Sequence, residues 1–493
     1  MNRRSNQKER EIAPEIVKGF QSTSGDDFQL NTITFLKNAA QYYPEVEIVS
    51  RNFDGSPFRY TYHAAHQRVK KLANALKRLG IGPGDRVGVM EWNTHRFYEL
   101  YVAVSGIGAV LVQFNPRIAS VDRAYVINHS GVRFIFITEL MIPLLEPVAN
   151  TLGRVEGYGV ITDSQPGQIT TNLHPVHDYE QLLAKEMAEF DWPMIDETSA
   201  FSACYTSGTT GNPKGGYYSH RCIYLHAMTA AANFSVTMND VMMQTVPMLE
   251  YIRSLPEKTD FTGLRMASGA TEPSLALMKG FQELGGIEII HAYGATETAP
   301  IVTANFLKPS LAGISQEEKW ELKKKQGIPV AGLDFKVVDM KGKEVPHDGV
   351  TVGELLIRGP WITAAYHNDP RNAESFVDGY WKSGDAGTAD RNGYLKISDR
   401  FKDLIKSGGE WISSIDLENA IMAHPEMTAK SFTPTAFSGA AIFSGSVRGT
   451  ASPFTNGART SSSGWLQHQR PGGGKLPFLP QQGPRGGGGG HAR

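Results

Sequence analysis

Segments with the hydrophobic spacing of helices and of strands alternate between residues 61 and 138, and this alternation limits the folds available to the chain. Apolar residues recur at helical intervals from Val69 to Leu79. The short apolar run at 86–90 then has the length of a buried strand, and runs at 109–113 and 132–137 repeat it around a further helical segment. Strands that alternate with helices are typical of a parallel, doubly wound sheet, so the sequence predicts an α/β fold.

Two more regions extend this prediction. The same alternation returns between residues 199 and 302, which predicts a second sheet layer. Shorter strand-like segments occupy residues 335–357 and 394–397, and Lys341-Gly342 and Asn392-Gly393 have the composition of tight turns. We therefore expect a large N-terminal domain that combines doubly wound sheets with a small β subdomain.

Composition excludes several classes of protein. Lys and Arg number 49 and Asp and Glu number 50, a balance that does not predict a nucleic-acid partner. The two cysteines, Cys204 and Cys222, cannot form a disulfide framework, and His220 beside Cys222 has no further ligand at zinc spacing. No apolar run approaches the roughly 20 residues of a membrane helix, and residues 1–20 lack the apolar core of a secretory signal. We therefore expect a cytoplasmic protein without an integral membrane segment.

The most informative segment for function is Tyr205-Thr-Ser-Gly-Thr-Thr-Gly-Asn-Pro-Lys-Gly215. It follows an apolar run that can end a strand, and it is dense in hydroxyl and backbone N–H groups that can donate to phosphate oxygens. Lys214 adds a positive charge, which can offset charge that develops on a phosphate. The spacing differs from that of the mononucleotide P-loop, because no Gly-Lys-Ser/Thr follows. We interpret the segment as a polyphosphate-binding loop rather than as a Ser/Gly-rich surface turn.

This loop resembles the phosphate loop of the adenylate-forming superfamily, which includes acyl-CoA synthetases, luciferases and nonribosomal-peptide adenylation domains. Four further motifs resemble those of the family and stand in the family's order. The segment at 399–411 and its continuation are most similar to long- and medium-chain fatty acyl-CoA synthetases, and the resemblance covers about residues 28–426 with one interruption. The four motifs are Ser268-Gly-Ala270, Tyr293-Gly-Ala-Thr-Glu-Thr298, Trp381-Lys-Ser-Gly-Asp385 and residues 399–411.

The resemblance implies a reaction in two steps. A carboxylic acid would first be joined to the α-phosphorus of ATP with release of pyrophosphate, and the thiol of coenzyme A would then displace AMP. Glu297, aided by Thr206 or Thr296, would hold Mg²⁺, a hard cation that prefers oxygen ligands and bridges phosphates. The predicted catalytic residues are therefore Lys214, Glu297 and Thr206, and the partners are ATP, coenzyme A and a small-molecule carboxylic acid.

The same resemblance implies a nucleotide site built from distant parts of the chain. Tyr293 would stack on adenine, Asp385 would accept hydrogen bonds from both ribose hydroxyls, and Arg400 would reach the ribose or a phosphate. Lys402 stands where the family has its hinge, whereas Lys406 and Trp411 would contact the nucleotide from the small domain. The predicted nucleotide-binding residues are Thr206, Ser207, Gly208, Thr209, Thr210, Gly211, Lys214, Gly269, Ala270, Tyr293, Gly294, Thr296, Asp385, Arg400, Lys402, Lys406 and Trp411. His291 is either a pocket residue or a packed strand residue.

Two departures from the family pattern indicate an altered enzyme. Between Lys214 and Tyr293 the chain is several dozen residues shorter than family members, with an apparent join near residues 248–249. The missing part would hold strands and helices that wall the acyl tunnel, and its loss would expose apolar faces and strand edges. Residues 431–493 contain no Asp or Glu and are rich in Gly, Pro and Ser, which predicts disorder, although a basic arm for RNA is the alternative interpretation.

These patterns give an expected domain organisation and three hypotheses about function. The leading hypothesis is an ATP-dependent fatty acid–CoA ligase that releases AMP and pyrophosphate. The alternatives are a catalytically impaired remnant that still binds nucleotide, and an adenylating ligase for a non-fatty carboxylic acid. The expected parts are an N-terminal extension at 1–27, an adenylation domain at 28–399, the start of a truncated small α+β domain at 400–430 and a low-complexity tail at 431–493.

Overall fold

The structure is a computed structural model that describes residues 16–25, 27–164, 169–206, 211–237, 264–269 and 272–400. After residue 400 it describes four short strands in two hairpins. The predicted join near 248–249 and most of the tail at 431–493 lie outside the described residues. The hairpin strands are β19 (Ile405–Ser407), β20 (Glu410–Ile412), β21 (Thr433–Phe437) and β22 (Ala440–Ser444).

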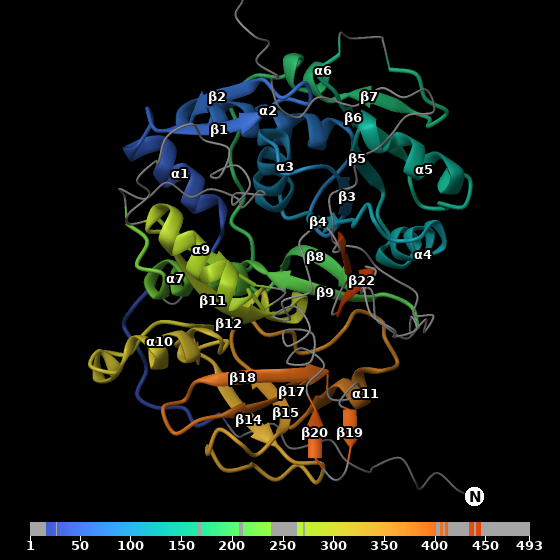
Figure 1. Cartoon of the computed structure of the whole chain (residues 1–493). Coiled ribbons are helices and arrows are strands. Elements are labelled where there is room, and N and C mark those ends of the chain that lie inside the picture. Colours follow the sequence, from blue (N-terminus) through green and yellow to red (C-terminus); the bar gives the residue numbers. More distant parts are fainter. Residues whose placement is uncertain are drawn as a thin grey trace, which may run out of the picture.

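A seven-stranded sheet forms the upper layer of the molecule in Figure 1. Its order is β7-β6-β5-β3-β4-β8-β9, and every neighbouring pair is parallel except β8–β9. This arrangement confirms the predicted doubly wound α/β class, and the strand predicted at 86–90 has those bounds. The strands are β3 (Arg86–Met90), β4 (Val110–Gln113), β5 (Phe134–Thr138), β6 (Gly157–Ile161), β7 (Val176–Asp178), β8 (Ala200–Thr206) and β9 (Lys214–Ser219).

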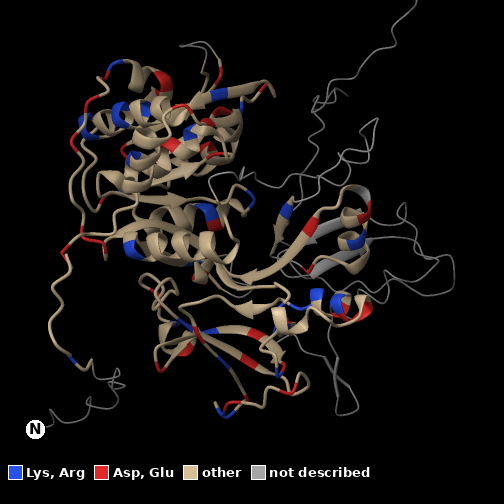
Figure 2. Cartoon of the chain, turned by 90° about the vertical axis from the view of Figure 1, so that its left-hand side faces the viewer, with Lys and Arg blue, Asp and Glu red and all other residues tan. Residues whose placement is uncertain are grey.

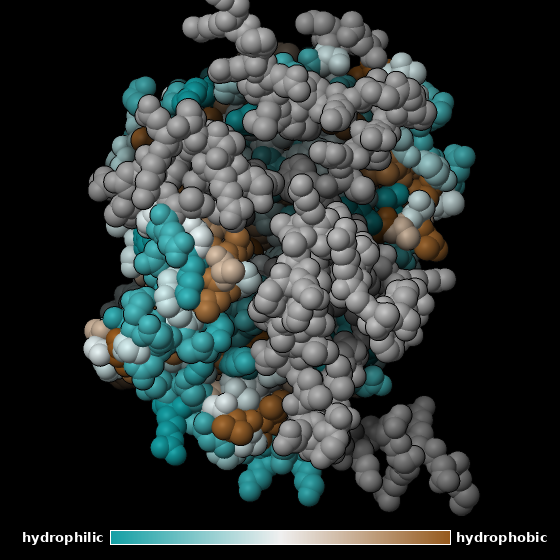
Figure 3. Space-filling model, in the orientation of Figure 1, coloured by the Kyte–Doolittle hydropathy of each residue, from teal (hydrophilic) through white to brown (hydrophobic). Residues whose placement is uncertain are grey.

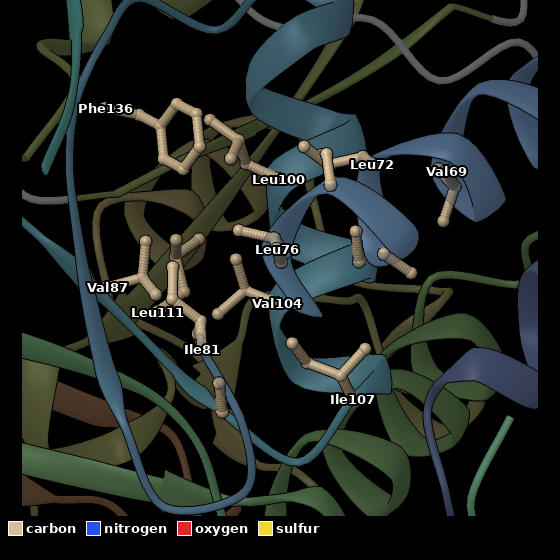
Figure 4. Close-up of a cluster of buried hydrophobic side chains, with 14 of the residues drawn as sticks. Val69, Leu72, Leu76, Ile81, Val87, Leu100, Val104, Ile107, Leu111 and Phe136 are labelled. Carbon is tan, nitrogen blue, oxygen red and sulfur yellow. The ribbon is translucent and has the colours of Figure 1, made fainter. Parts of the chain in front are cut away.

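Helices cover both faces of this sheet because alternate residues of a strand point to opposite faces. Phe134 and Phe136 of β5 pack with α2 and α3, as Figure 4 shows for Phe136, whereas Ile135 and Ile137 pack with α4 and α5. A separate hairpin of β1 (Glu47–Arg51) and β2 (Pro57–Thr61) contacts α2 and α3. The helices are α1 (Ile33–Tyr42), α2 (Tyr62–Arg78), α3 (His95–Gly106), α4 (Ser120–Ser130), α5 (Ile142–Ala149) and α6 (Tyr179–Ala184).

A four-stranded sheet follows, and here the predicted alternation is only partly kept. β10 and β11 are parallel with α9 between them, but β11–β12, β12–β13 and β8–β9 are antiparallel. The connections at 207–213 and 295–300 are too short for the crossover that a parallel pair needs. The elements are α7 (His220–Asn233), β10 (Arg265–Ser268), α9 (Leu275–Gly285), β11 (Glu288–Gly294), β12 (Ile301–Ala304), α10 (Gln316–Lys323) and β13 (Ile328–Pro329).

The small β subdomain is confirmed as a five-stranded antiparallel sheet at the bottom of Figure 1. Both predicted turns are present, and Gly342 and Gly393 have φ angles of 77° and 80°, a region that favours glycine. The elements are β14 (Asp334–Val338), β15 (Gly353–Arg358), α11 (Asn372–Ser375), β16 (Phe376–Val377), β17 (Tyr380–Ala389) and β18 (Leu395–Arg400).

The surface of the described part is mixed in character. Figure 2 shows basic and acidic residues interspersed over the described elements. Figure 3 shows mostly hydrophilic residues where Figure 1 places α9 and α10, with a hydrophobic patch beside α9. Within the described residues, the structure contains no helix whose length and apolar character would let it cross a bilayer.

Candidate active site

The predicted phosphate loop joins the antiparallel strands β8 and β9. Thr206 ends β8, Lys214 begins β9, and the two residues are paired in the strand register. Gly211 has a φ of 86°, which favours glycine at that point of the loop. Ser207, Gly208, Thr209 and Thr210 lie outside the described residues. The structure therefore brings together the two ends of the loop, one a predicted magnesium ligand and the other the predicted catalytic lysine.

A tight turn after β11 places Glu297. A Cβ added to Gly294, the last residue of β11, would lie 1.6 Å from the carbonyl oxygen of Pro300, so that only glycine fits there. The short 3₁₀ helix η2 (Thr296–Thr298) follows and carries Glu297, whose side chain is buried. Glycine at 294 is thus a geometric requirement of the turn that presents the predicted magnesium ligand.

The side chain of Tyr366 contacts both Lys214 and Glu297. Its hydroxyl donates to Glu297 Oε1 at 2.7 Å, and Lys214 Nζ lies 4.5 Å from the centre of its ring. Lys214 Nζ also donates to Ser375 Oγ at 3.3 Å, and Trp381 Nε1 donates to the Tyr366 hydroxyl at 3.1 Å. Burial lowers the pKa of Lys214, because the charged form is less well solvated there. The lysine and the carboxylate therefore belong to one cluster.

A second cluster contains the residues predicted to bind the nucleoside. The Tyr293 hydroxyl donates to Asp385 Oδ2 at 2.5 Å, and Arg400 Nη1 lies 3.1 Å from Asp385 Oδ1. Asp385 on β17 and Arg400 on β18 are paired in register, which explains how the ion pair forms. Burial raises the pKa of Asp385, and the nearby Arg400 guanidinium opposes that effect without cancelling it.

The two clusters lie on shared elements. Tyr293 on β11 and Glu297 on the adjoining η2 stand four residues apart, and Trp381 and Asp385 stand four residues apart on β17. Gly269 directly follows β10, where an added Cβ would lie 3.2 Å from a carbonyl oxygen of β11. One site thus collects most of the predicted residues that the structure describes.

Other predicted residues are placed less fully. Ala270 and Lys402 lie outside the described residues, and their roles stay predictions. Lys406 and Trp411 are paired in register between β19 and β20, and their contact with nucleotide also stays a prediction. His291 is a packed strand residue of β11 with 3% exposure, and burial lowers its pKa to about 4.

Glu297 and Thr206 offer oxygen atoms, which Mg²⁺ prefers as ligands. Among the described residues, no group of three or more His, Cys, Asp or Glu side chains could hold a metal ion on its own. Glu297 and Thr206 nevertheless fit the usual way of binding Mg²⁺ beside a nucleotide, through one or two carboxylates and the phosphates. The chemistry of the residues therefore fits an ion that arrives with ATP.

The sequence did not predict that residues 367–371 would form hydrogen bonds to the end of the phosphate loop. Arg371 Nη2 donates to the carbonyl oxygen of Asn212 at 2.8 Å and pairs with Asp369 at 2.5 Å. The backbone N–H of His367 donates to the carbonyl oxygen of Gly215 at 2.8 Å. Between β15 and α11 this segment lacks strand or helix periodicity, and the only signal was a run of aromatic and charged residues.

The fold and the site together define a nucleotide-binding α/β enzyme. The profile of the AMP-binding enzyme family matches residues 36–250 and 248–367, which is more than half of the chain. The chain belongs to this family. The two matched segments meet at the join that the sequence predicts near residues 248–249.

Curated relatives are CoA ligases. The chain is 35% identical to a long-chain-fatty-acid–CoA ligase of Thermus thermophilus, with 84% of each chain covered. It is 33% identical to a medium-chain-fatty-acid–CoA ligase of Ectopseudomonas oleovorans, covering 81% of this chain and 83% of the relative. It is also 32% identical to a 3-methylmercaptopropionyl-CoA ligase of Ruegeria lacuscaerulensis, covering 80% and 83%.

Solved structures share the fold. The anthranilate CoA ligase AuaEII has a TM-score of 0.68 at 20% identity, with 84% of this chain and 85% of that chain covered. A long-chain-fatty-acid–CoA ligase from Archaeoglobus fulgidus has a TM-score of 0.64 at 20% identity, with 84% and 90% covered. These similarities confirm the α/β fold of an adenylate-forming enzyme.

The alignments also show how much this chain lacks. The alignment with the Thermus thermophilus ligase extends over 468 residues, whereas 84% of this chain of 493 residues is about 414. Roughly fifty aligned positions therefore have no counterpart in this chain. The number is of the size predicted for the missing part between Lys214 and Tyr293, and the location of that part stays a prediction.

Proposed function

We propose that this chain is an ATP-dependent fatty acid–CoA ligase that works through an acyl-adenylate and releases AMP and pyrophosphate. The observation that carries the proposal is the convergence of Lys214, Glu297 and Asp385 from three separate sequence motifs. The relatives at 35% and 33% identity are named as long- and medium-chain fatty acid ligases, which supports a fatty acid as the substrate.

The chemistry assigned to these residues is electrostatic. In the first step, a carboxylate oxygen of the acid forms a bond to the α-phosphorus of ATP, and the bond to pyrophosphate breaks. Lys214 and the hydroxyl groups of the loop bind the phosphates, and Lys214 offsets charge as pyrophosphate leaves. Bound Mg²⁺, held by Glu297 and Thr206, would supply further positive charge at the phosphates. In the second step, the CoA thiolate displaces AMP from the acyl carbon.

Binding of the nucleoside would fall to the second cluster. Asp385 would accept hydrogen bonds from the ribose hydroxyls, and Arg400 beside it would reach the ribose or a phosphate. Tyr293 would place its ring against the adenine while its hydroxyl stays bonded to Asp385. The position of Gly269 beside β11 supports a turn that adenine can approach closely.

A second candidate function is a nucleotide-binding remnant of the family. It is favoured by the roughly fifty aligned positions that have no counterpart in this chain, because the family resemblance predicts that a missing part near residues 248–249 would wall the acyl tunnel. The residues of the nucleotide site lie on either side of the join. Such a remnant would bind ATP and would not transfer an acyl group.

Release of pyrophosphate separates the two candidates. The purified chain would be given ATP, Mg²⁺ and carboxylic acids from acetate to palmitate, with one aromatic acid included. An active ligase should release pyrophosphate only with acid and at a rate that rises with chain length. Lys214→Ala should reduce that rate at least a hundredfold, because the phosphates lose their cation.

A matched control keeps this result interpretable. Lys341→Ala removes an exposed lysine at a turn of the β subdomain and should leave the rate unchanged. Saturable binding of ATP without acid-dependent pyrophosphate release would refute the ligase and favour the remnant. Turnover confined to short or aromatic acids would refute the fatty acid as substrate and keep the adenylating chemistry.

A further inference from the structure

Tyr366 contacts both Lys214 and Glu297, although it belongs to neither motif that supplies them. Its hydroxyl donates to Glu297 Oε1 at 2.7 Å, and its ring lies under Lys214 Nζ at 4.5 Å. A hydrogen bond to an ionised acceptor is stronger than one between neutral groups. One side chain is thus in contact with both a carboxylate and a cation that act on the same phosphates.

The surroundings of Tyr366 fix the direction of its hydroxyl proton. Trp381 Nε1 donates to the hydroxyl oxygen at 3.1 Å, so the single O–H is left to donate to Glu297. The Tyr366 backbone is bonded twice to Asn372, from its N–H to Oδ1 at 2.8 Å and at its carbonyl from Nδ2 at 2.9 Å. Burial, and then the nearby Glu297 charge, raise the pKa of Tyr366, so the hydroxyl keeps its proton.

We propose that Tyr366 is a positioning residue, which holds the Glu297 carboxylate in one orientation for Mg²⁺ and holds Lys214 over its ring for the phosphates of ATP. This inference rests on the proposed function. Without the hydroxyl, the Glu297 carboxylate would have to be ordered when the metal binds, and that ordering would lower the affinity for Mg²⁺. Without the ring, Lys214 would lose a contact that orients its ammonium group.

The test measures nucleotide binding, which does not depend on turnover. A fluorescent ATP analogue is titrated into the full chain at increasing Mg²⁺ and, separately, in EDTA. Tyr366→Phe keeps the ring and removes the hydroxyl, so the Mg²⁺ midpoint should rise about three- to tenfold while binding in EDTA is unchanged. Tyr366→Leu removes both contacts and should also weaken binding in EDTA.

Tyr380→Phe is the matched control. Tyr380 is equally buried, its hydroxyl donates to Asp334 Oδ2 at 2.7 Å, and Lys336 Nζ lies 4.7 Å from its ring. Tyr380→Phe therefore loses a tyrosine–carboxylate hydrogen bond of the same kind, but at a place away from Glu297. This variant should not shift the Mg²⁺ midpoint. If Tyr380→Phe shifted the Mg²⁺ midpoint as much as Tyr366→Phe, the inference would be overturned. Loss of any buried tyrosine hydroxyl would then be enough to cause the shift.

A double variant separates positioning from a general loss of stability. Combining Tyr366→Phe with Glu297→Gln should raise the Mg²⁺ midpoint no further than Glu297→Gln alone, because the hydroxyl acts through that carboxylate. Fully additive shifts, or an unshifted midpoint in Tyr366→Phe, would overturn the positioning role. Mg²⁺-dependent binding without turnover would refute the ligase alone, and a chain that binds no ATP would refute both proposals.

Discussion

Replacing Asp385 with asparagine tests whether the site recognises ribose. In the structure, Oδ1 of this residue pairs with Arg400 and Oδ2 accepts from Tyr293. An ionised carboxylate has about four lone-pair positions, so both ribose hydroxyls can be accepted without displacing these partners. Asparagine has nearly the same shape, but it lacks the charge and one acceptor oxygen.

The expected loss of affinity follows from this difference. A hydrogen bond to a charged acceptor contributes about 1.5–3 kcal/mol, and asparagine can replace one of two such bonds by a weaker neutral one. We therefore expect ATP binding to weaken by about 2 kcal/mol, or roughly thirtyfold in Kd. The Arg400 side chain is 51% exposed and can turn to solvent, so the free energy of unfolding should fall by only about 1 kcal/mol.

Deoxy analogues make the assignment specific. Calorimetric titrations of the unmodified chain should show weaker binding of 2′-deoxy-ATP and of 3′-deoxy-ATP than of ATP. In Asp385→Asn the three nucleotides should differ less in affinity, because one hydroxyl loses its acceptor and the other keeps only a weaker, neutral one. A variant that still discriminates as strongly as the unmodified chain would refute the role of Asp385 in binding ribose.

Three further outcomes are expected. Gly294→Ala should unfold the turn before Glu297 and cost more than 3 kcal/mol in chemical denaturation, whereas Gly280→Ala in α9 has open space and should stabilise by up to about 1 kcal/mol; equal effects would contradict the clash. ATP affinity should fall on acidification at a higher pH than for an ordinary aspartate, because burial raises the pKa of Asp385, and Asp385→Asn should remove that dependence. Burial lowers the pKa values of His220 and His291 to about 4, so the unfolded chain binds protons first as the pH falls below about 6.5. The free energy of unfolding should then drop by on the order of 1–2 kcal/mol for each histidine by pH 5, and a His291→Gln variant with an equally steep pH dependence would contradict this.

The sequence predicted the first sheet well because its strands are short apolar runs separated by helices. β3 has the predicted bounds, and the turns at Gly342 and Gly393 were marked by their own residues. The direction of β9 and β12 was not predicted, since hydrophobic spacing carries no information on whether neighbouring strands run parallel. Direction follows from the length of the connection, and both connections are short.

The site was predicted where residues form motifs and missed where contacts form only in the fold. Lys214, Glu297 and Asp385 each stand in a recognisable motif, and the structure places them in one site. Tyr366 stands in an irregular segment, and its bonds to Glu297 and from Trp381 join parts of the chain that no local pattern connects. Its role could be inferred only from the assembled structure.

The position of the predicted join indicates whether binding of the acid or binding of the nucleotide would be impaired first. Among the described strands, β10 lies at one edge of the four-stranded sheet, and the predicted join precedes it in sequence. Gly269 directly follows β10, and Tyr293 lies on the neighbouring strand β11, whereas Asp385 and Arg400 lie on the paired strands β17 and β18 of another sheet. Because β17 and β18 pair with each other in a separate sheet, we expect the ion pair of Asp385 with Arg400 to persist without the segment predicted to be missing. Loss of the segment should therefore affect the choice and binding of the acid before it affects the nucleotide.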